Sequence, residues 1–156
     1  MIRLEIPGRN QIELKHAVFD VNGTLAVDGN LIEGIQKPFQ TIRDTLDVHL
    51  LTANTHGAQE DIDRTLSIQA TIIEKGKEAQ QKADFVKELG ADHTIAFGQG
   101  ANDAKMVAAA SIGICLLSEE GTALQTLLNA DLVVPDILSA LNLLENPIRL
   151  VASLRD

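Results

Sequence analysis

The sequence predicts a three-layer α/β/α domain built on a central parallel sheet. Short apolar runs rich in β-branched residues alternate with longer stretches in which apolar residues recur at helical spacing. Strands that alternate with helices of about ten residues are typical of βαβ units. No repeat or linker interrupts the 156 residues, so we expect one domain that covers residues 1–156.

The predicted strands begin with a hairpin at the N-terminus. Residues 2–6 alternate apolar and polar side chains, residues 7–10 carry the turn signal Pro-Gly-Arg-Asn, and residues 12–19 form the second strand. The later apolar runs are short enough for buried parallel strands. They fall at residues 48–51, 70–73, 94–97, 112–116 and 132–134.

Helical patterns lie between these strands. They cover residues 35–46, 58–66, 79–89, 103–110, 122–129 and 137–144. Gly90 is a helix stop, and Pro147 is expected to begin a last short helix that ends at Leu154. Between Thr24 and Thr52 there is room only for a small hairpin at residues 27–30 and one helix. We therefore expect no cap domain.

Composition excludes several classes of function. The net charge is −9, and the chain has no Trp, no Tyr and four Phe, so we expect no nucleic-acid partner. No apolar run approaches the roughly 20 residues of a membrane span, and the first five residues lack the apolar block of a signal peptide. The single cysteine, Cys115, excludes an internal disulfide and lies in an apolar run typical of a buried, inert thiol. We expect a soluble, cytoplasmic protein.

The strongest motif lies at the end of the strand predicted for residues 12–19. There Asp20 is followed by Val-Asn-Gly-Thr-Leu, which places a carboxylate and a glycine turn where parallel α/β sheets bind ligands. Such a carboxylate can act as a nucleophile or a metal ligand, and Gly23 lets backbone N–H groups turn toward an anion. The structural alternative is a turn aspartate followed by an Asn-Gly hairpin turn.

Two further motifs are ambiguous by themselves. The strand at residues 48–51 ends next to Thr52, whose hydroxyl could bind phosphate or could simply cap the following helix. A lysine near the helix at residues 79–89 could offset the charge of a phosphoryl group. From position alone Lys75, Lys77 and Lys82 are all candidates.

The fourth motif, residues 98–103, has the sequence Gly-Gln-Gly-Ala-Asn-Asp between a strand and a helix. One alternative is a dinucleotide-binding fingerprint, with the acidic pair Glu119 and Glu120 about 20 residues further on. However, Asp103 replaces the third glycine, and its negative charge would oppose a pyrophosphate. At this strand end the glycines let the backbone approach a ligand closely, and Asp103 begins the following helix.

Taken together, the four motifs resemble those of the haloacid dehalogenase superfamily, and within it the phosphorylation domain of P-type ATPases and its soluble relatives. Residues 20–25 resemble Asp-Lys-Thr-Gly-Thr-Leu, and residues 51–54 resemble the family's Thr-Gly-Asp-Asn segment. Residues 82–89 are similar to the lysine helix, which selects Lys82. Residues 98–104 resemble Gly-Asp-Gly-x-Asn-Asp-Ala, and the resemblance covers nearly the whole chain.

The resemblance implies a magnesium-dependent phosphohydrolase that acts through an aspartyl-phosphate. The resemblance implies that the catalytic residues are Asp20, Asn22 and Lys82. The phosphate-binding residues are Thr52, Ala53, Asn102 and Gly23. The ligands of Mg²⁺ are Asp20, Asn22, Gln99 and Asp103. The partner would be a phosphorylated small molecule or macromolecule, and an open site without a cap makes a homo-oligomer possible.

Three amides depart from the family pattern and keep a second hypothesis open. Asn22 stands where active phosphatases have an aspartate that acts as general acid and base. An amide cannot donate a proton to a substrate and take it back at neutral pH. Gln99 replaces the usual magnesium-binding aspartate, although Mg²⁺ prefers charged oxygen ligands. Asn54 replaces a third aspartate. The alternative function is therefore a binding or regulatory protein that keeps the fold without turnover. His56 could border the site, but a surface histidine is the simpler interpretation.

Overall fold

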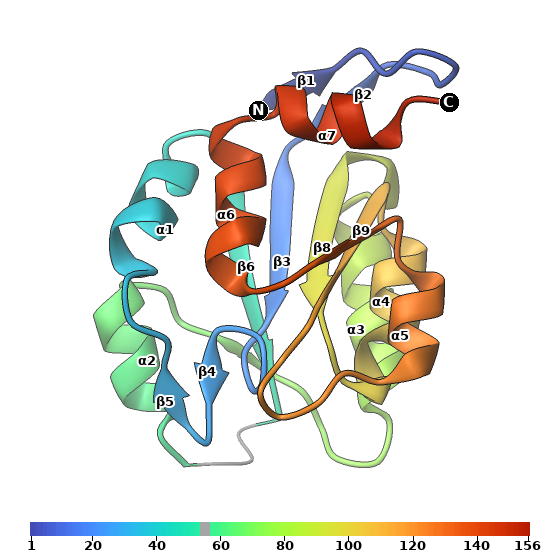
Figure 1. The fold of residues 1–156 in the computed structure, drawn as a ribbon. Helices are drawn as coiled ribbons and strands as arrows, with labels where there is room; N and C mark the ends of the chain where they lie inside the picture. Colours follow the sequence, from blue (N-terminus) through green and yellow to red (C-terminus); the bar gives the residue numbers. More distant parts are fainter. Residues whose placement is uncertain (54–56) are drawn as a thin grey trace.

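The computed structural model describes residues 1–53 and 57–156 and has the predicted α/β/α architecture (Figure 1). A six-stranded parallel sheet in the order β10-β9-β8-β3-β6-β7 forms the middle layer. Its strands are β3 (His16–Asp20), β6 (Asp47–Thr52), β7 (Thr71–Ile72), β8 (Thr94–Gly98), β9 (Ile112–Leu116) and β10 (Leu132–Val134). Because all six strands are parallel, their carboxyl ends meet at one edge of the sheet.

Helices cover both faces of this sheet (Figure 1). They are α1 (Gln36–Arg43), α2 (Gln59–Leu66), α3 (Glu78–Leu89), α4 (Ala104–Ala109), α5 (Leu124–Asn129), α6 (Ile137–Glu145) and α7 (Ile148–Leu154). On one face α3, α4 and α5 pack against each other, and on the other face α1 packs against α6 and α2. No helix of the described residues is long and apolar enough to cross a membrane.

Side-chain alternation along the middle strand separates the core into two parts. Phe19 belongs to the larger cluster. Its ring stacks on Phe97 with a distance of 4.4 Å between ring centroids, and it packs against Phe39 of α1 with a centroid distance of 5.2 Å. Its neighbour Val18 belongs to the smaller cluster under α3 and α4, together with Val86. Since successive side chains of a strand point to opposite faces, β3 is buried on both sides.

The predicted N-terminal hairpin forms, but the prediction of one continuous strand over residues 12–19 is wrong. β1 (Ile2–Leu4) pairs only with β2 (Ile12–Leu14), and the central sheet begins at His16. Lys15 marks the break because its N–H donates to the His93 carbonyl and its carbonyl accepts from the Asp47 N–H. These long-range bonds redirect the chain from the small sheet into the large one.

Other boundaries differ by a few residues. The helix predicted for residues 103–110 begins with a 3-10 turn, η2 (Ala101–Asp103), and α1 ends at Arg43, followed by turn residues. The expected small hairpin is present as β4 (Ala26–Val27) paired with β5 (Asn30–Leu31). Cys115 is fully buried in β9, and this burial raises the pKa of its thiol.

Two histidines meet near the amino ends of the strands, away from the predicted site. His49 Nε2 lies 3.3 Å from His16 Nδ1, and the His49 ring meets Phe85 edge to face. Burial and the neighbouring His16 lower the pKa of His49, and Asp47, whose carboxylate lies 3.7 Å from His16, opposes this. The folded protein therefore disfavours a proton on His49.

This pair predicts a loss of stability in weak acid. The unfolded chain protonates His49 near pH 6.5, whereas the folded state does so only at lower pH, so folding is favoured fully above about pH 6.5 and less as the pH falls below it. His49→Gln should flatten this pH dependence. Urea unfolding of both proteins at pH 5.5 and 7.5 measures it, and parallel losses in the two would show that the pair contributes nothing.

Candidate active site

Asp20 lies at the carboxyl end of the middle strand of the sheet. β3 is flanked by β6 and β8, and Asp20 pairs in register with Leu51 of β6. The backbone continues from β3 into the sheet edge, where the Val21 N–H donates to the Leu51 carbonyl. The parallel topology therefore brings the loops after β3, β6 and β8 together around one carboxylate.

Lys82 connects Asp20 to the fourth motif. Its ammonium group lies 2.6 Å from Asp20 Oδ1 and 2.7 Å from Asp103 Oδ1. All three side chains are buried, with exposed fractions of 1% for Lys82, 5% for Asp20 and 0% for Asp103. Lys75 and Lys77, the other two candidates from the sequence, are exposed.

The charges of this triad act on one another. Burial and the charge of Asp103 raise the pKa of Asp20 to about 7, while the contacts from Lys82 and Thr24 work in the opposite direction. Burial tends to lower the pKa of Lys82, but the two carboxylates outweigh it and hold that pKa above its usual value. Lys82 thus stays charged between the two carboxylates, while Asp20 can take up a proton near neutral pH.

The loop after Asp20 makes a tight turn around the carboxylate. Thr24 Oγ1 donates to Asp20 Oδ2 at 3.1 Å, so each Asp20 oxygen has a donor. Gly23 has a φ of +84°, and a Cβ there would lie 1.9 Å from Gln99 Nε2. A side chain at position 23 would therefore be strained and would displace Gln99.

The amides at positions 22 and 99 lie next to each other. Gln99 Nε2 donates to the Asn22 backbone carbonyl at 3.2 Å. The Asn22 side chain turns the other way and donates to Thr52 Oγ1 at 3.1 Å. The predicted phosphate-binding hydroxyl and the residue at the acid–base position are therefore in direct contact.

The loop of the fourth motif is held from two sides. Asp103 Oδ2 accepts hydrogen bonds of 3.0 Å from the N–H groups of Gln99 and Gly100, so both Asp103 oxygens are engaged. On the outer side Thr126 Oγ1 donates to the Gly100 carbonyl at 2.6 Å, and the Ala123 N–H donates to the Gln99 carbonyl. This bonding fixes Gln99 above Gly23.

The other predicted site residues differ in their exposure to solvent. Thr52 is buried, Ala53 is partly buried, and Asn102, which lies in η2, is exposed. Asn54 and His56 lie outside the described residues. The motifs did not predict the contact between Thr24 and Asp20, although Thr24 lies in the same motif, four residues after the predicted nucleophile. The sequence had no signal for Thr126, which lies in a distant helix.

Comparison with known proteins identifies relatives that match part of the chain. No family model matches the chain. Over 85 residues the chain is 40% identical to the uncharacterized protein MJ0073 of Methanocaldococcus jannaschii, a match that covers 52% of this chain and 91% of that protein. Over 108 residues, 68% of this chain, it is 32% identical to a probable copper-exporting P-type ATPase of Archaeoglobus fulgidus, of which it spans 13%.

The chain also has the fold of solved phosphatase structures. The chain superposes with a TM-score of 0.66 and 18% identity on a 3-deoxy-D-manno-octulosonate 8-phosphate phosphatase from Moraxella catarrhalis, covering 91% of this chain and 94% of the other. The fold is that of the haloacid dehalogenase superfamily, close to the P-type ATPase-like members, as the motifs predicted. Within it, the chain belongs to one family with MJ0073.

The buried triad predicts a large loss of stability when its cation is removed. Lys82→Met leaves two buried carboxylates without a counter-charge, which should lower the free energy of unfolding by about 3–5 kcal/mol. Adding Asp103→Asn should restore part of that loss, because only one uncompensated carboxylate remains. Denaturant unfolding measures both changes.

Lys87→Met provides the matched control on the same helix. The Lys87 side chain is 59% exposed, so this change should stay within about 0.5 kcal/mol of wild type. Similar losses from Lys82→Met and Lys87→Met would contradict the account of the triad.

Proposed function

We propose that the chain is a phosphohydrolase or phosphotransferase that accepts a phosphoryl group on Asp20. The observation that carries this proposal is the Asp20 carboxylate at the carboxyl end of the middle strand, with the Lys82 ammonium 2.6 Å away and the Gly23 turn beside it. Carboxylates act as nucleophiles toward phosphorus, and catalysis of phosphoryl transfer consists mainly of positioning and charge stabilisation. The fold of the Moraxella phosphatase adds support.

In the proposed reaction an oxygen of Asp20 attacks phosphorus while the bond from phosphorus to the ester oxygen breaks. Lys82 offsets the negative charge that this adds at Asp20, and Asp103 holds the ammonium group in place. The hydroxyl of Thr52, which is buried beside Asn22, would bind a phosphoryl oxygen, together with the backbone N–H of Ala53. The Gly23 N–H donates to the Ala26 carbonyl at 2.7 Å, so Gly23 shapes the turn and does not supply a phosphate donor. Water then cleaves the aspartyl-phosphate and releases phosphate.

Asn22 limits the proton transfers of this sequence. Its amide donates to Thr52 and has no proton to give to a leaving alcohol or to recover from water. We therefore propose that substrates with good leaving groups, such as aryl esters, react faster than alkyl esters, and that release of phosphate is slow. The same substitution is what favours the alternative function, a binding or regulatory protein without turnover.

We propose that the oxygen donors of the site take a divalent cation such as Mg²⁺. The Asn22 carbonyl and the Gln99 side-chain oxygen are hard donors of the kind Mg²⁺ prefers, and they lie next to the two carboxylates of the triad. In this structure the Gln99 amide presents its Nε2 to the Asn22 carbonyl, so the amide must turn before its oxygen can coordinate a cation. The ligands would be Asp20, the Asn22 carbonyl and Gln99, whereas Asp103 is engaged with Lys82 and the loop. When bound, the cation would neutralise charge on the phosphoryl oxygens.

Beryllofluoride tests phosphoryl capture. With Mg²⁺ it mimics the aspartyl-phosphate, and at about 100 times its Kd it should stabilise the fold by about 2.7 kcal/mol, a rise in Tm of roughly 5–10 °C. Asp20→Asn should abolish the rise, and Asp92→Asn, an exposed control at the far edge of the sheet, should keep it. A wild-type protein that shows no rise at millimolar mimic would remove the support for an active site at Asp20.

Restoring the two carboxylates tests what limits turnover. Gln99→Asp should mainly tighten Mg²⁺, since it supplies a charged ligand next to the Asn22 carbonyl, and Asn22→Asp should mainly speed release of phosphate. General acid–base catalysis is worth about 10²- to 10⁴-fold, so the double variant should hydrolyse p-nitrophenyl phosphate well above wild type.

Gln40→Asp, an exposed change of the same kind on α1, is the control for added charge and should leave the rate at the wild-type value. Circular dichroism checks that each variant folds. A folded double variant that is as inactive as Asp20→Asn would favour the binding or regulatory function instead.

A further inference from the structure

A cavity adjoins the candidate active site. It has a volume of about 450 Å³, and its wall includes Gly23 and Thr24 from the loop that follows Asp20. Since Thr24 donates to Asp20 Oδ2 at 3.1 Å, a wall residue of the cavity touches the proposed nucleophile. The volume lies in the range of pockets that hold small organic ligands, about 300–1,000 Å³.

Three segments that are distant in sequence frame this cavity. They are the β4–β5 hairpin, the residues around the end of β9, and the start of α6. Most of the lining side chains are apolar. They are Val27, Leu31, Ile32, Leu116, Leu117, Pro135, Ile137 and Leu138. Leu117 is 51% exposed and Leu138 is 43% exposed, so apolar surface lies open to solvent at the mouth.

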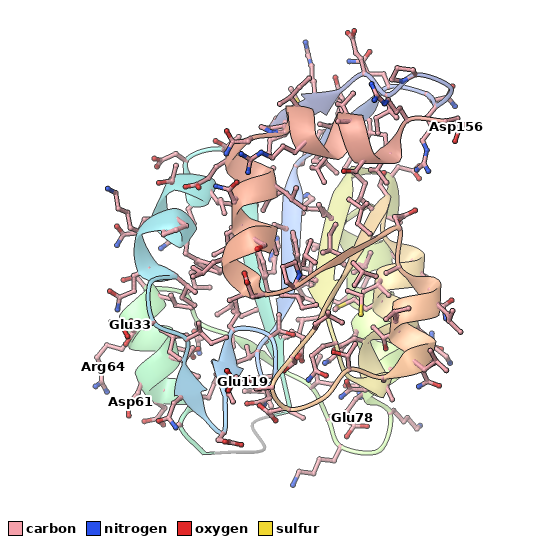
Figure 2. All side chains as sticks on the ribbon, in the orientation of Figure 1. Glu33, Asp61, Arg64, Glu78, Glu119 and Asp156 are labelled. Atoms are coloured by element: carbon pink, nitrogen blue, oxygen red, sulfur yellow. The ribbon has the colours of Figure 1, made fainter. Side chains whose placement is uncertain are left out.

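The charged residues of the lining are both acidic. Glu119, labelled in Figure 2, lines the cavity together with Val27 of β4, and Asp136 caps α6 by accepting a hydrogen bond of 2.7 Å from the Ser139 N–H. Glu120 adds a third carboxylate next to the hairpin, where it accepts from the Asp28 N–H at 3.3 Å. The lining contains no lysine or arginine among the residues described.

We propose that this cavity receives the organic part of the phosphate ester and selects an apolar group that carries no negative charge. The inference rests on the proposed function, because Asp20 holds the phosphoryl group and the cavity begins at Thr24 next to it. Apolar walls favour an aromatic or branched alkyl group. The carboxylates of Glu119 and Asp136 repel a carboxylate or a second phosphate. The substrate class is thus a neutral or amine-bearing aryl or alkyl monoester, not a nucleoside polyphosphate or a sugar acid.

Phosphonates, which are not hydrolysed, test this selectivity by calorimetry with Mg²⁺ present. Four probes separate size from charge: methylphosphonate, benzylphosphonate, 1-naphthylmethylphosphonate and 4-carboxybenzylphosphonate. Burial of each ring should tighten binding roughly tenfold. The added carboxylate should weaken binding about fivefold or more relative to benzylphosphonate.

Two variants locate the effect. Leu138→Lys should reduce the preference for 1-naphthylmethylphosphonate over methylphosphonate at least fivefold, whereas Leu128→Lys, 72% exposed on α5 and outside the cavity, should leave the preference unchanged. Glu119→Gln should reduce the penalty for the carboxylate.

The outcomes separate the two proposals. If methylphosphonate and beryllofluoride bind but wild type shows no preference for rings, or the preference survives Leu138→Lys, the cavity assignment is overturned and the role of Asp20 stands. If no phosphonate binds and beryllofluoride causes no rise in Tm, the proposed function fails and the cavity proposal fails with it.

Discussion

The ammonium group of Lys82 lies between two buried carboxylates, and the rest of the site is arranged around that contact. Helix α3 supplies Lys82, β3 supplies Asp20, and the turn before α4 supplies Asp103, so one charge joins three elements of the fold. Buried charges are costly unless they are paired and hydrogen-bonded. The second oxygen of Asp103 then fixes the N–H groups of Gln99 and Gly100, which extends the same constraint to the loop.

This electrostatic arrangement explains how the site accommodates amides at positions 22 and 99, where the phosphatase motifs that it resembles have carboxylates. With aspartates at 22 and 99, four carboxylates would surround one lysine, and a tightly held cation would be needed to balance them. With Asn22 and Gln99 only the two carboxylates of the triad remain, and the amide of Gln99 donates directly to the Asn22 carbonyl. The two amides therefore reduce the number of negative charges that the site must hold, and in the proposed reaction they would lower its affinity for metal and its capacity for proton transfer.

Local patterns in the sequence were sufficient for the parallel sheet, the small hairpin and the position of Asp20, because strand period, helix period and turn residues are local signals. They were insufficient where distant partners decide. Lys15 breaks the predicted strand through bonds to His93 and Asp47, which no local pattern reveals. Helical position did not separate Lys82 from Lys75, and only the family resemblance did. The close packing of Gln99 against Gly23 brings together two loops whose residues lie 76 positions apart in the sequence.

The same parallel topology also explains how the residues described, which include no cap domain, can shape a pocket near Asp20. Strands β3, β9 and β10 run in one direction, so the residues that follow each of them emerge at one edge of the sheet. The hairpin after β3 is short, and it becomes one wall only because Leu117 and Leu138 approach from the last third of the chain. Selectivity at such a site would then be encoded far from the catalytic motifs, in positions that can change without disturbing the buried triad.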